Sequence, residues 1–181
     1  MELVMQEAPD LGIPEVKPAI ESIRGVWEQK VSPKTAHSLL QGRLTVALVS
    51  VFGDLGDVGP EWRFYLLPPG EEPSSLVPDI AYVSFGRLPE SPGELREKPT
   101  IAPDIAVEIL SPGDRMKTLA TKIEMYLTYG SKLVIVVDPQ ERSVTFHEAT
   151  GTRTVSHVQG IAVPDAYPHL RINLTELFAR I

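Results

Sequence analysis

The sequence predicts a single α/β domain over residues 1–181, in which a mixed central β-sheet is flanked by helices. A length of 181 residues suits one domain. Residues 105–137 contain an apolar strand, a helix and a second apolar strand in succession, which is typical of a crossover between parallel strands. Two alternating segments within 143–157 indicate a hairpin. Parallel and antiparallel pairs are therefore expected in one sheet.

The N-terminal part is expected to contribute helices. Residues 20–25 are interpreted as the end of a short helix, followed by an extended run as far as Val31. Ser32 and Pro33 supply an N-cap and a proline at the first helical position. Apolar residues then recur at helical spacing as far as Val51. One long amphipathic helix is predicted there, ending in a glycine-rich turn.

The middle of the chain reads as strands around a loop. Aromatic and aliphatic residues predict strands over 62–67 and 76–85, and the stretch 86–103, rich in Pro, Glu and Arg, is interpreted as a surface loop. Residues 105–110 are almost entirely apolar, the pattern of a central strand covered on both faces. A second buried strand is predicted over 133–137.

The remaining elements follow from start and stop signals. Ser111 and Pro112 repeat the helix-start signal, and an apolar stripe runs from Met116 to the stop at Gly130. Beyond it we expect a closing hairpin and one short C-terminal helical turn. These elements are predicted over 143–148, 152–157 and 174–178.

Charge and composition exclude several classes of protein. The 17 Lys and Arg against 24 Asp and Glu give a formal net charge of −7, which argues against DNA binding through a large basic surface. Cysteine is absent, which excludes disulfide scaffolds, thiolate zinc sites and cysteine catalysis. No export signal is visible and no apolar run approaches the ~20 residues of a membrane span. A cytoplasmic protein without membrane partners is expected.

Most familiar catalytic motifs are missing. The sequence has no glycine-rich phosphate loop, no GxGxxG after a strand, no HExxH and no GxSxG. The four histidines lie on different predicted elements without metal-ligand spacing, so each is interpreted as a surface or core residue. The unusual feature that remains is acidic residues in apolar segments.

Glu108 is the clearest of these acids because it interrupts a run that otherwise reads as fully buried. A buried carboxylate needs a cation, hydrogen bonds or an open site. Asp104 shares its strand face, but four residues of strand span about 13 Å, too far for one ion. Asp79, at the start of another apolar strand, can come much closer. The pair could hold Mg²⁺; the alternative is that Asp79 caps a turn and Glu108 pairs with an Arg or Lys.

Lys122 is the candidate cation for this site. On the predicted helix it lies one turn from both Leu119 and Tyr126, at the border of the apolar stripe. A crossover helix can direct a border lysine back toward the end of the strand that precedes it. The alternative is a surface lysine whose stem covers apolar neighbours.

Several segments together carry a resemblance. They are VPDIAYV, PDIAVEILSP, TKIEMYLTYG and KLVIVVDP in this order, with ESIRG and SPKTAH before them and GIAVPDAYPHLRINLTELF after them. This combination resembles a bacterial restriction endonuclease family with the PD-(D/E)XK nuclease fold. It covers nearly the whole chain, and it implies a restriction-endonuclease-like arrangement for the predicted α/β fold.

The resemblance assigns roles to individual positions. It implies that Asp79 is the aspartate of the motif, that Glu108 is its second acid and that Ile109 lends a backbone carbonyl to the metal. The motif lysine would fall at Leu110, which is a departure from the pattern. The resemblance implies that this lysine has moved to the following helix, at Lys122.

The implied activity is hydrolysis of nucleic-acid phosphodiester bonds, DNA first, with Mg²⁺ or Mn²⁺ as cofactor. Lys122 would position the attacking water or offset charge on phosphorus. Glu21 is similar to an extra acid that some members supply from the first helix, and we include it among the catalytic candidates. A homodimer or higher homo-oligomer is expected because two strands need two sites.

Two other functions stay open. A nuclease-fold protein without catalysis could serve as a binding or assembly module, and a small-molecule phosphoesterase could use the same site chemistry. Basic and acidic residues alternate between residues 87 and 122, so no basic stripe is visible. A basic cleft would have to draw on distant residues such as Lys34, Arg43 and Arg63.

Overall fold

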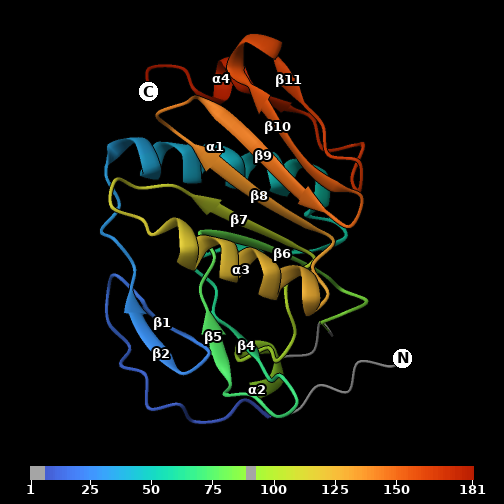
Figure 1. Cartoon of the computed structure of the whole chain (residues 1–181). Helices are drawn as coiled ribbons and strands as arrows, with labels where there is room; N and C mark the ends of the chain where they lie inside the picture. The colour runs from blue at the N-terminus through green and yellow to red at the C-terminus, as the bar shows by residue number, and fades with distance from the viewer. Residues whose placement is uncertain (1–6, 89–92) are drawn as a thin grey trace.

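A computed structural model gives the structure of residues 7–88 and 93–181 (Figure 1). Its main sheet has six strands in the order β10-β9-β8-β7-β6-β3. Only the β7–β8 pair is parallel among the pairs of this sheet, so the predicted mixed sheet is confirmed. The strands are β3 (Gly56–Pro60), β6 (Ile80–Ser84), β7 (Ile105–Ile109), β8 (Leu133–Asp138), β9 (Ser143–Glu148) and β10 (Gly151–Ser156).

Two helices cover opposite faces of this sheet. Helix α1 (Thr35–Phe52) lies behind it and α3 (Met116–Thr128) in front of it in Figure 1. Strand β7 serves both faces because its side chains alternate. Its odd-numbered residues pack in the cluster that contains α1, whereas Ala106 packs in the cluster that contains α3. Glu108 shares the parity of Ala106, so its side chain emerges on the α3 face.

A second sheet lies below the main one in Figure 1. Its order is β2-β1-β5-β4, and its strands are β1 (Ile20–Ile23), β2 (Val26–Gln29), β4 (Phe64–Leu66) and β5 (Ser74–Leu76). The prediction of a helix end at 20–25 was therefore wrong. Ile23 pairs with Val26, and Arg24 and Gly25 between them have φ of 49° and 78°. A two-residue hairpin turn requires these positive φ values.

The strand predicted over 76–85 is two strands in different sheets. Strand β5 ends at Leu76 and β6 begins at Ile80. Pro78 lies in the break, where its missing N–H removes no ladder hydrogen bond. Asp79 is the last residue before β6 and so lies at the junction of the two sheets. The chain also forms β3 directly after the predicted turn, a strand that the sequence did not indicate.

The other predicted elements are present. Helix α1 begins at Thr35, two residues beyond Pro33, because Lys34 is still extended. The predicted loop contains α2 (Glu94–Glu97), while its residues 89–92 lie outside the described part. The β9–β10 hairpin matches its prediction. The C-terminal part contains a 3₁₀ turn (His157–Gln159), β11 (Ile161–Ala162), β12 (Ile172–Asn173) and α4 (Leu174–Leu177). None of the helices described here is long and apolar enough to cross a membrane.

Candidate active site

Glu108 lies near the carboxyl end of β7, on the face that α3 covers. Its Oε1 is 2.7 Å from Lys122 Nζ and accepts a hydrogen bond of 2.9 Å from the Tyr126 hydroxyl. Lys122 and Tyr126 are one helical turn apart, so both reach the same point of the strand. All three side chains are buried. The sequence prediction that Lys122 points back toward the end of β7 is confirmed.

Asp79 lies beside the carboxyl end of β7, directly before β6. The register of β6 and β7 pairs Ile80 with Val107, and Asp79 is the residue that precedes Ile80. The backbone N–H of Asp79 donates to Val107 O at 2.9 Å, and its Oδ2 accepts from the N–H of Ile109 at 2.6 Å. These bonds fix the carboxylate at the edge of β7.

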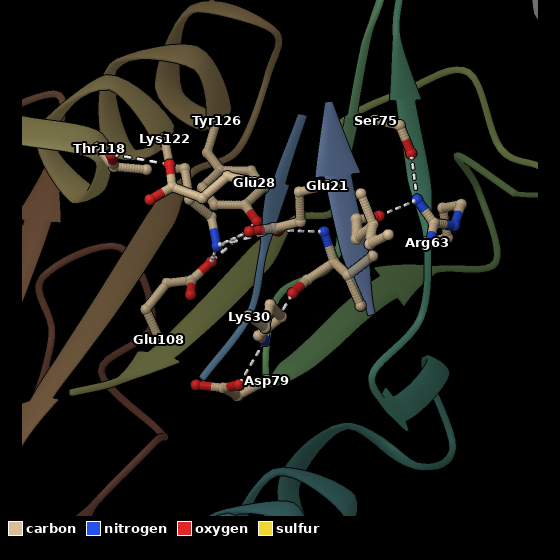
Figure 2. Close-up of polar contacts among 12 residues, drawn as sticks. Glu21, Glu28, Lys30, Arg63, Ser75, Asp79, Glu108, Thr118, Lys122 and Tyr126 are labelled. Carbon is tan, nitrogen blue, oxygen red and sulfur yellow. Dashed lines mark hydrogen bonds and ion pairs between the residues drawn. The ribbon is translucent and has the colours of Figure 1, made fainter. Parts of the chain in front are cut away.

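Glu21 brings a third carboxylate, from strand β1 rather than from the predicted helix. Both of its oxygens lie 3.0 Å from Lys122 Nζ, and Oε1 also accepts a 2.6 Å hydrogen bond from the Val77 N–H. The β1–β2 hairpin is thereby held against α3. Figure 2 shows Lys122 reaching from α3 between Glu21 and Glu108.

Sequence reasoning missed two residues of the cluster, Lys30 and His37. Lys30 Nζ lies 2.5 Å from Asp79 Oδ1, and His37 Nε2 lies 3.2 Å from Asp79 Oδ2. The interpretation of every histidine as an ordinary surface or core residue therefore overlooked a contact with the candidate site. The only sequence signal was the position of His37 at the start of a helix within SPKTAH.

The charges of the cluster shift the pKa values of its members. Burial raises the pKa of Glu108, against the opposing charges of Lys122 and Lys30. Burial alone would also raise the pKa of Asp79, but the Lys30 charge and the hydrogen bond from His37 hold it well below its ordinary value. Burial would lower the pKa of Lys122, but Glu108 and Glu21 raise it far above the usual range. The two carboxylates therefore favour the charged form of Lys122.

A small pocket of about 90 Å³ opens over the cluster. Its lining includes Glu21, Lys30, Asp79 and Lys122. Two larger hollows, of about 310 and 460 Å³, share residues with it, and all three meet at His37. The hollows together form a groove that crosses the candidate site on the surface beside the start of α1.

The donor set fits a hard divalent cation. No group of three or more His, Cys, Asp or Glu able to hold a metal occurs among the described residues. Asp79 and Glu108 nevertheless offer two carboxylates, and the ion pair and the hydrogen bond of Glu108 both involve Oε1. Mg²⁺ requires few protein ligands because it keeps several of its waters. The 90 Å³ pocket, which Asp79 and Ile109 line and Glu108 does not, has room for such waters beside Asp79.

Comparison with known proteins decides the family. The model of the Uma2 family, described as "Putative restriction endonuclease", matches residues 8–175. The chain belongs to the Uma2 family. The expected resemblance and the restriction-endonuclease-like fold are thereby confirmed.

A solved structure supports the same assignment. The chain is similar to a crystal structure titled as a putative nuclease belonging to DUF820 from Anabaena variabilis ATCC 29413. The TM-score is 0.82 at 29% sequence identity, over 93% of this chain and 94% of that one. A search of curated proteins finds no match. The nuclease fold of the Uma2 family therefore extends over nearly the whole chain.

Within this Uma2 chain, one cluster contains the predicted site residues Glu21, Asp79, Glu108 and Lys122. The backbone N–H of Ile109 contacts this cluster by donating to Asp79. Two of the cations suggested for a basic cleft lie elsewhere. Arg43 donates to Leu177 O, and Arg63 donates to Ser75 and to Ile20 O. Lys34 lines the 460 Å³ hollow of the groove. Glu108 also forms the pairing with lysine that was the alternative interpretation.

Proposed function

We propose that this Uma2 protein is a metal-dependent endonuclease that hydrolyses phosphodiester bonds in nucleic acid. The observation that carries the proposal is that Asp79 and Glu108 meet at the end of β7: Asp79 accepts a hydrogen bond from the Ile109 N–H, and Lys122 Nζ lies 2.7 Å from Glu108. The family assignment and the nuclease neighbour give independent support.

The residues present could hold Mg²⁺ or Mn²⁺ through oxygen. Asp79 and Glu108 would supply carboxylate oxygens, and the backbone carbonyl of Ile109 would supply a third. Bound there, such an ion supplies Lewis-acid chemistry that polarises the scissile phosphate and lowers the pKa of a water ligand. The protein's own contribution is to fix these oxygens, and the hydrogen bond from Ile109 N–H to Asp79 does so directly.

Lys122 acts by charge rather than as a base. Burial would lower its pKa, but Glu108 and Glu21 raise it, which favours the protonated ammonium. A fixed cation near the reacting phosphate stabilises the negative charge that develops in the transition state. Glu21 holds this ammonium from the side opposite Glu108 and is therefore a positioning residue.

Charge balance is consistent with an anionic substrate. Glu21, Asp79 and Glu108 carry three negative charges against the two positive charges of Lys30 and Lys122. A divalent cation would add two positive charges and offset this negative excess. One phosphodiester group would then complement the site, although the whole chain carries −7.

The test is cleavage by the wild type and by Asp79→Asn, Glu108→Gln and Lys122→Met. Plasmid DNA, single-stranded DNA and RNA are incubated with Mg²⁺, with Mn²⁺ and with EDTA. We expect metal-dependent cleavage by the wild type and a loss of about 10²-fold or more in each variant. Circular dichroism confirms that the variants are folded. No cleavage of any substrate by the wild type, or equal cleavage by all four proteins, would contradict the proposal.

DNA as the first substrate, a homodimer and a cytoplasmic location belong to the same proposal. Two identical sites related by a two-fold axis suit the two strands of a duplex. Analytical ultracentrifugation tests the dimer, and comparison of the three nucleic acids tests the substrate.

A binding module without catalysis is the second candidate. The observation in its favour is that lysines already balance Asp79 and Glu108 at 2.5 and 2.7 Å. Such a module does not need metal at this pair. Calorimetric titration with Mn²⁺ separates the two functions, because only the nuclease requires binding that depends on Asp79 and Glu108.

A further inference from the structure

Lys30 forms an ion pair with Asp79, the carboxylate that the metal would need. It follows β2 directly, and its Nζ lies 2.5 Å from Asp79 Oδ1 and donates to Val77 O at 2.8 Å. Its side chain is 17% exposed, compared with 4% for Asp79. Figure 2 shows the Lys30 side chain directed at Asp79, on the side of the cluster away from Lys122.

The second oxygen of Asp79 is also engaged. Oδ2 accepts from the Ile109 N–H at 2.6 Å and lies 3.2 Å from His37 Nε2. A metal ligand must direct a lone pair at the ion, and Mg²⁺ binds oxygen at about 2.1 Å. An ammonium group and a divalent ion on the same carboxylate repel each other strongly in a buried site. The unused lone pair of Asp79 is therefore on Oδ1, where a bound metal would lie against the Lys30 ammonium and be repelled by it.

Lys30 is the partner that can leave. The Ile109 N–H is fixed in the sheet, and His37 is buried at the start of α1. Lys30 ends a flexible four-carbon chain and lines both the 90 Å³ pocket and the adjoining 310 Å³ hollow. Rotation of its side chain into that hollow would free Oδ1 without moving the backbone.

We propose that Lys30 is an exchangeable counter-ion that competes with the divalent cation for Asp79. The inference rests on the proposed function, since it presumes metal binding at Asp79 and Glu108. Without metal, Lys30 compensates the buried carboxylate and keeps the site folded. With metal, the ion must displace it, so Lys30 lowers the metal affinity of the site and raises the metal concentration at which the protein is loaded.

Calorimetric titration with Mn²⁺ tests the competition at neutral pH. The proteins are the wild type, Lys30→Met, Lys30→Gln and the control Lys17→Met. Lys17 lines the same 310 Å³ hollow, and no ion pair joins it to Asp79 among the described residues. We expect both Lys30 variants to bind Mn²⁺ about tenfold tighter or more, and Lys17→Met to stay within about twofold of the wild type. Asp79→Asn should abolish binding in the wild-type and Lys30→Met backgrounds.

Thermal unfolding gives a second readout. In EDTA, Lys30→Met should melt at a lower temperature than the wild type, because Asp79 is left buried without its cation. Saturating Mn²⁺ should raise its melting temperature more than that of the wild type. A residue needed only for packing would give the first effect without the second.

The outcomes separate the two proposals. If the wild type cleaves nucleic acid and binds Mn²⁺, but the folded Lys30 variants bind it equally or more weakly, only the competition is refuted. If neither the wild type nor the Lys30 variants bind Mn²⁺, removal of the lysine has not made Asp79 available to the metal, and this result also refutes the competition. The cleavage assay then decides independently on the nuclease.

Discussion

A carboxylate inside a buried sheet needs a cation, hydrogen bonds or an open site, and at Glu108 a cation comes from the next helix. Lys122 and the Tyr126 hydroxyl converge on Glu108 Oε1 at 2.7 and 2.9 Å. Glu108 was predictable because an acid stood out in an apolar run, and Lys122 because it bordered an apolar stripe. Lys30 and His37 were not predictable in this way, since only tertiary folding brings them to Asp79.

Asp79 gives the cluster a defined dependence on pH. Burial alone would raise its pKa, but the contacts with Lys30 and His37 together outweigh burial and hold the pKa well below the ordinary 3.8. A depressed pKa contributes stability that is fully present above the unfolded-state pKa and is lost as the pH falls toward the folded-state pKa. In EDTA, Asp79→Asn should therefore lower the free energy of unfolding by ~3–5 kcal/mol at neutral pH. Below pH 3.8 the difference from the wild type should narrow.

Urea denaturation of both proteins across this pH range measures that difference. Asp138→Asn is a suitable control, because Asp138 only caps a local turn through Gln140 and Glu141. An Asp79→Asn difference that stays constant down to strongly acidic pH would show that Asp79 is not a stabilising anion.

At the scale of elements, length decided what the sequence could reveal. The long periodic helices and the β7–α3–β8 crossover were predicted because each spans enough residues to show a period. The β1–β2 hairpin was misread because four-residue strands hardly distinguish alternation from helical spacing. The break at Pro78 was missed because Leu76, the one apolar residue of β5, was joined to β6 in a single predicted strand over 76–85. That break places Asp79 at the junction of the two sheets. The strand boundary that was hardest to predict is therefore the one that positions a candidate site residue.

In the β7–α3 unit, the lysine at position 122 of α3 can be replaced by a lysine at position 110, directly after β7. Leu110 follows Glu108 by two residues, so it shares the strand parity of Glu108, and it lines the 90 Å³ pocket. We expect Lys122→Met with Leu110→Lys to recover cleavage about tenfold over Lys122→Met alone. Leu110→Met in the same background is the matched control. Equal activity of the two double variants would show that the ammonium works only from α3, where Glu21 also holds it.

The edge strand β3 supports β6 and thus the position of Asp79. A Cβ on Gly56 would lie 2.2 Å from Val83 O, whereas one on Gly59 would meet only the Trp62 ring at 3.8 Å. Gly56→Ala should therefore destabilise the protein by about 1–3 kcal/mol, and Gly59→Ala by less than about 0.5 kcal/mol. For a chain of this length the first corresponds to a melting temperature lower by roughly 2–10 °C. Equal melting temperatures for the two variants would contradict the close contact at Gly56.

For the whole molecule, the net charge of −7 limits how nucleic acid can be bound. Arg43 and Arg63 are engaged away from the groove, and the groove lining mixes Lys34 with acids such as Asp114 and Asp138. A neutral-to-acidic groove gains little from counterion release along the backbone. Affinity must then depend on the few charges at the site itself, and on the cation that would offset the negative charge of the cluster.

This dependence predicts metal-promoted binding. Ca²⁺ binds carboxylates with a geometry different from that of Mg²⁺. Ca²⁺ is therefore the ion chosen for the binding measurement. A fluorescent DNA should bind at least about tenfold tighter in Ca²⁺ than in EDTA at matched ionic strength, as measured by anisotropy. Asp79→Asn should remove that gain, because the ion loses a ligand, whereas Lys17→Met should keep it. Equal affinity in Ca²⁺ and EDTA for the wild type would place the binding charge outside the cluster and would require another basic surface to carry the nucleic acid.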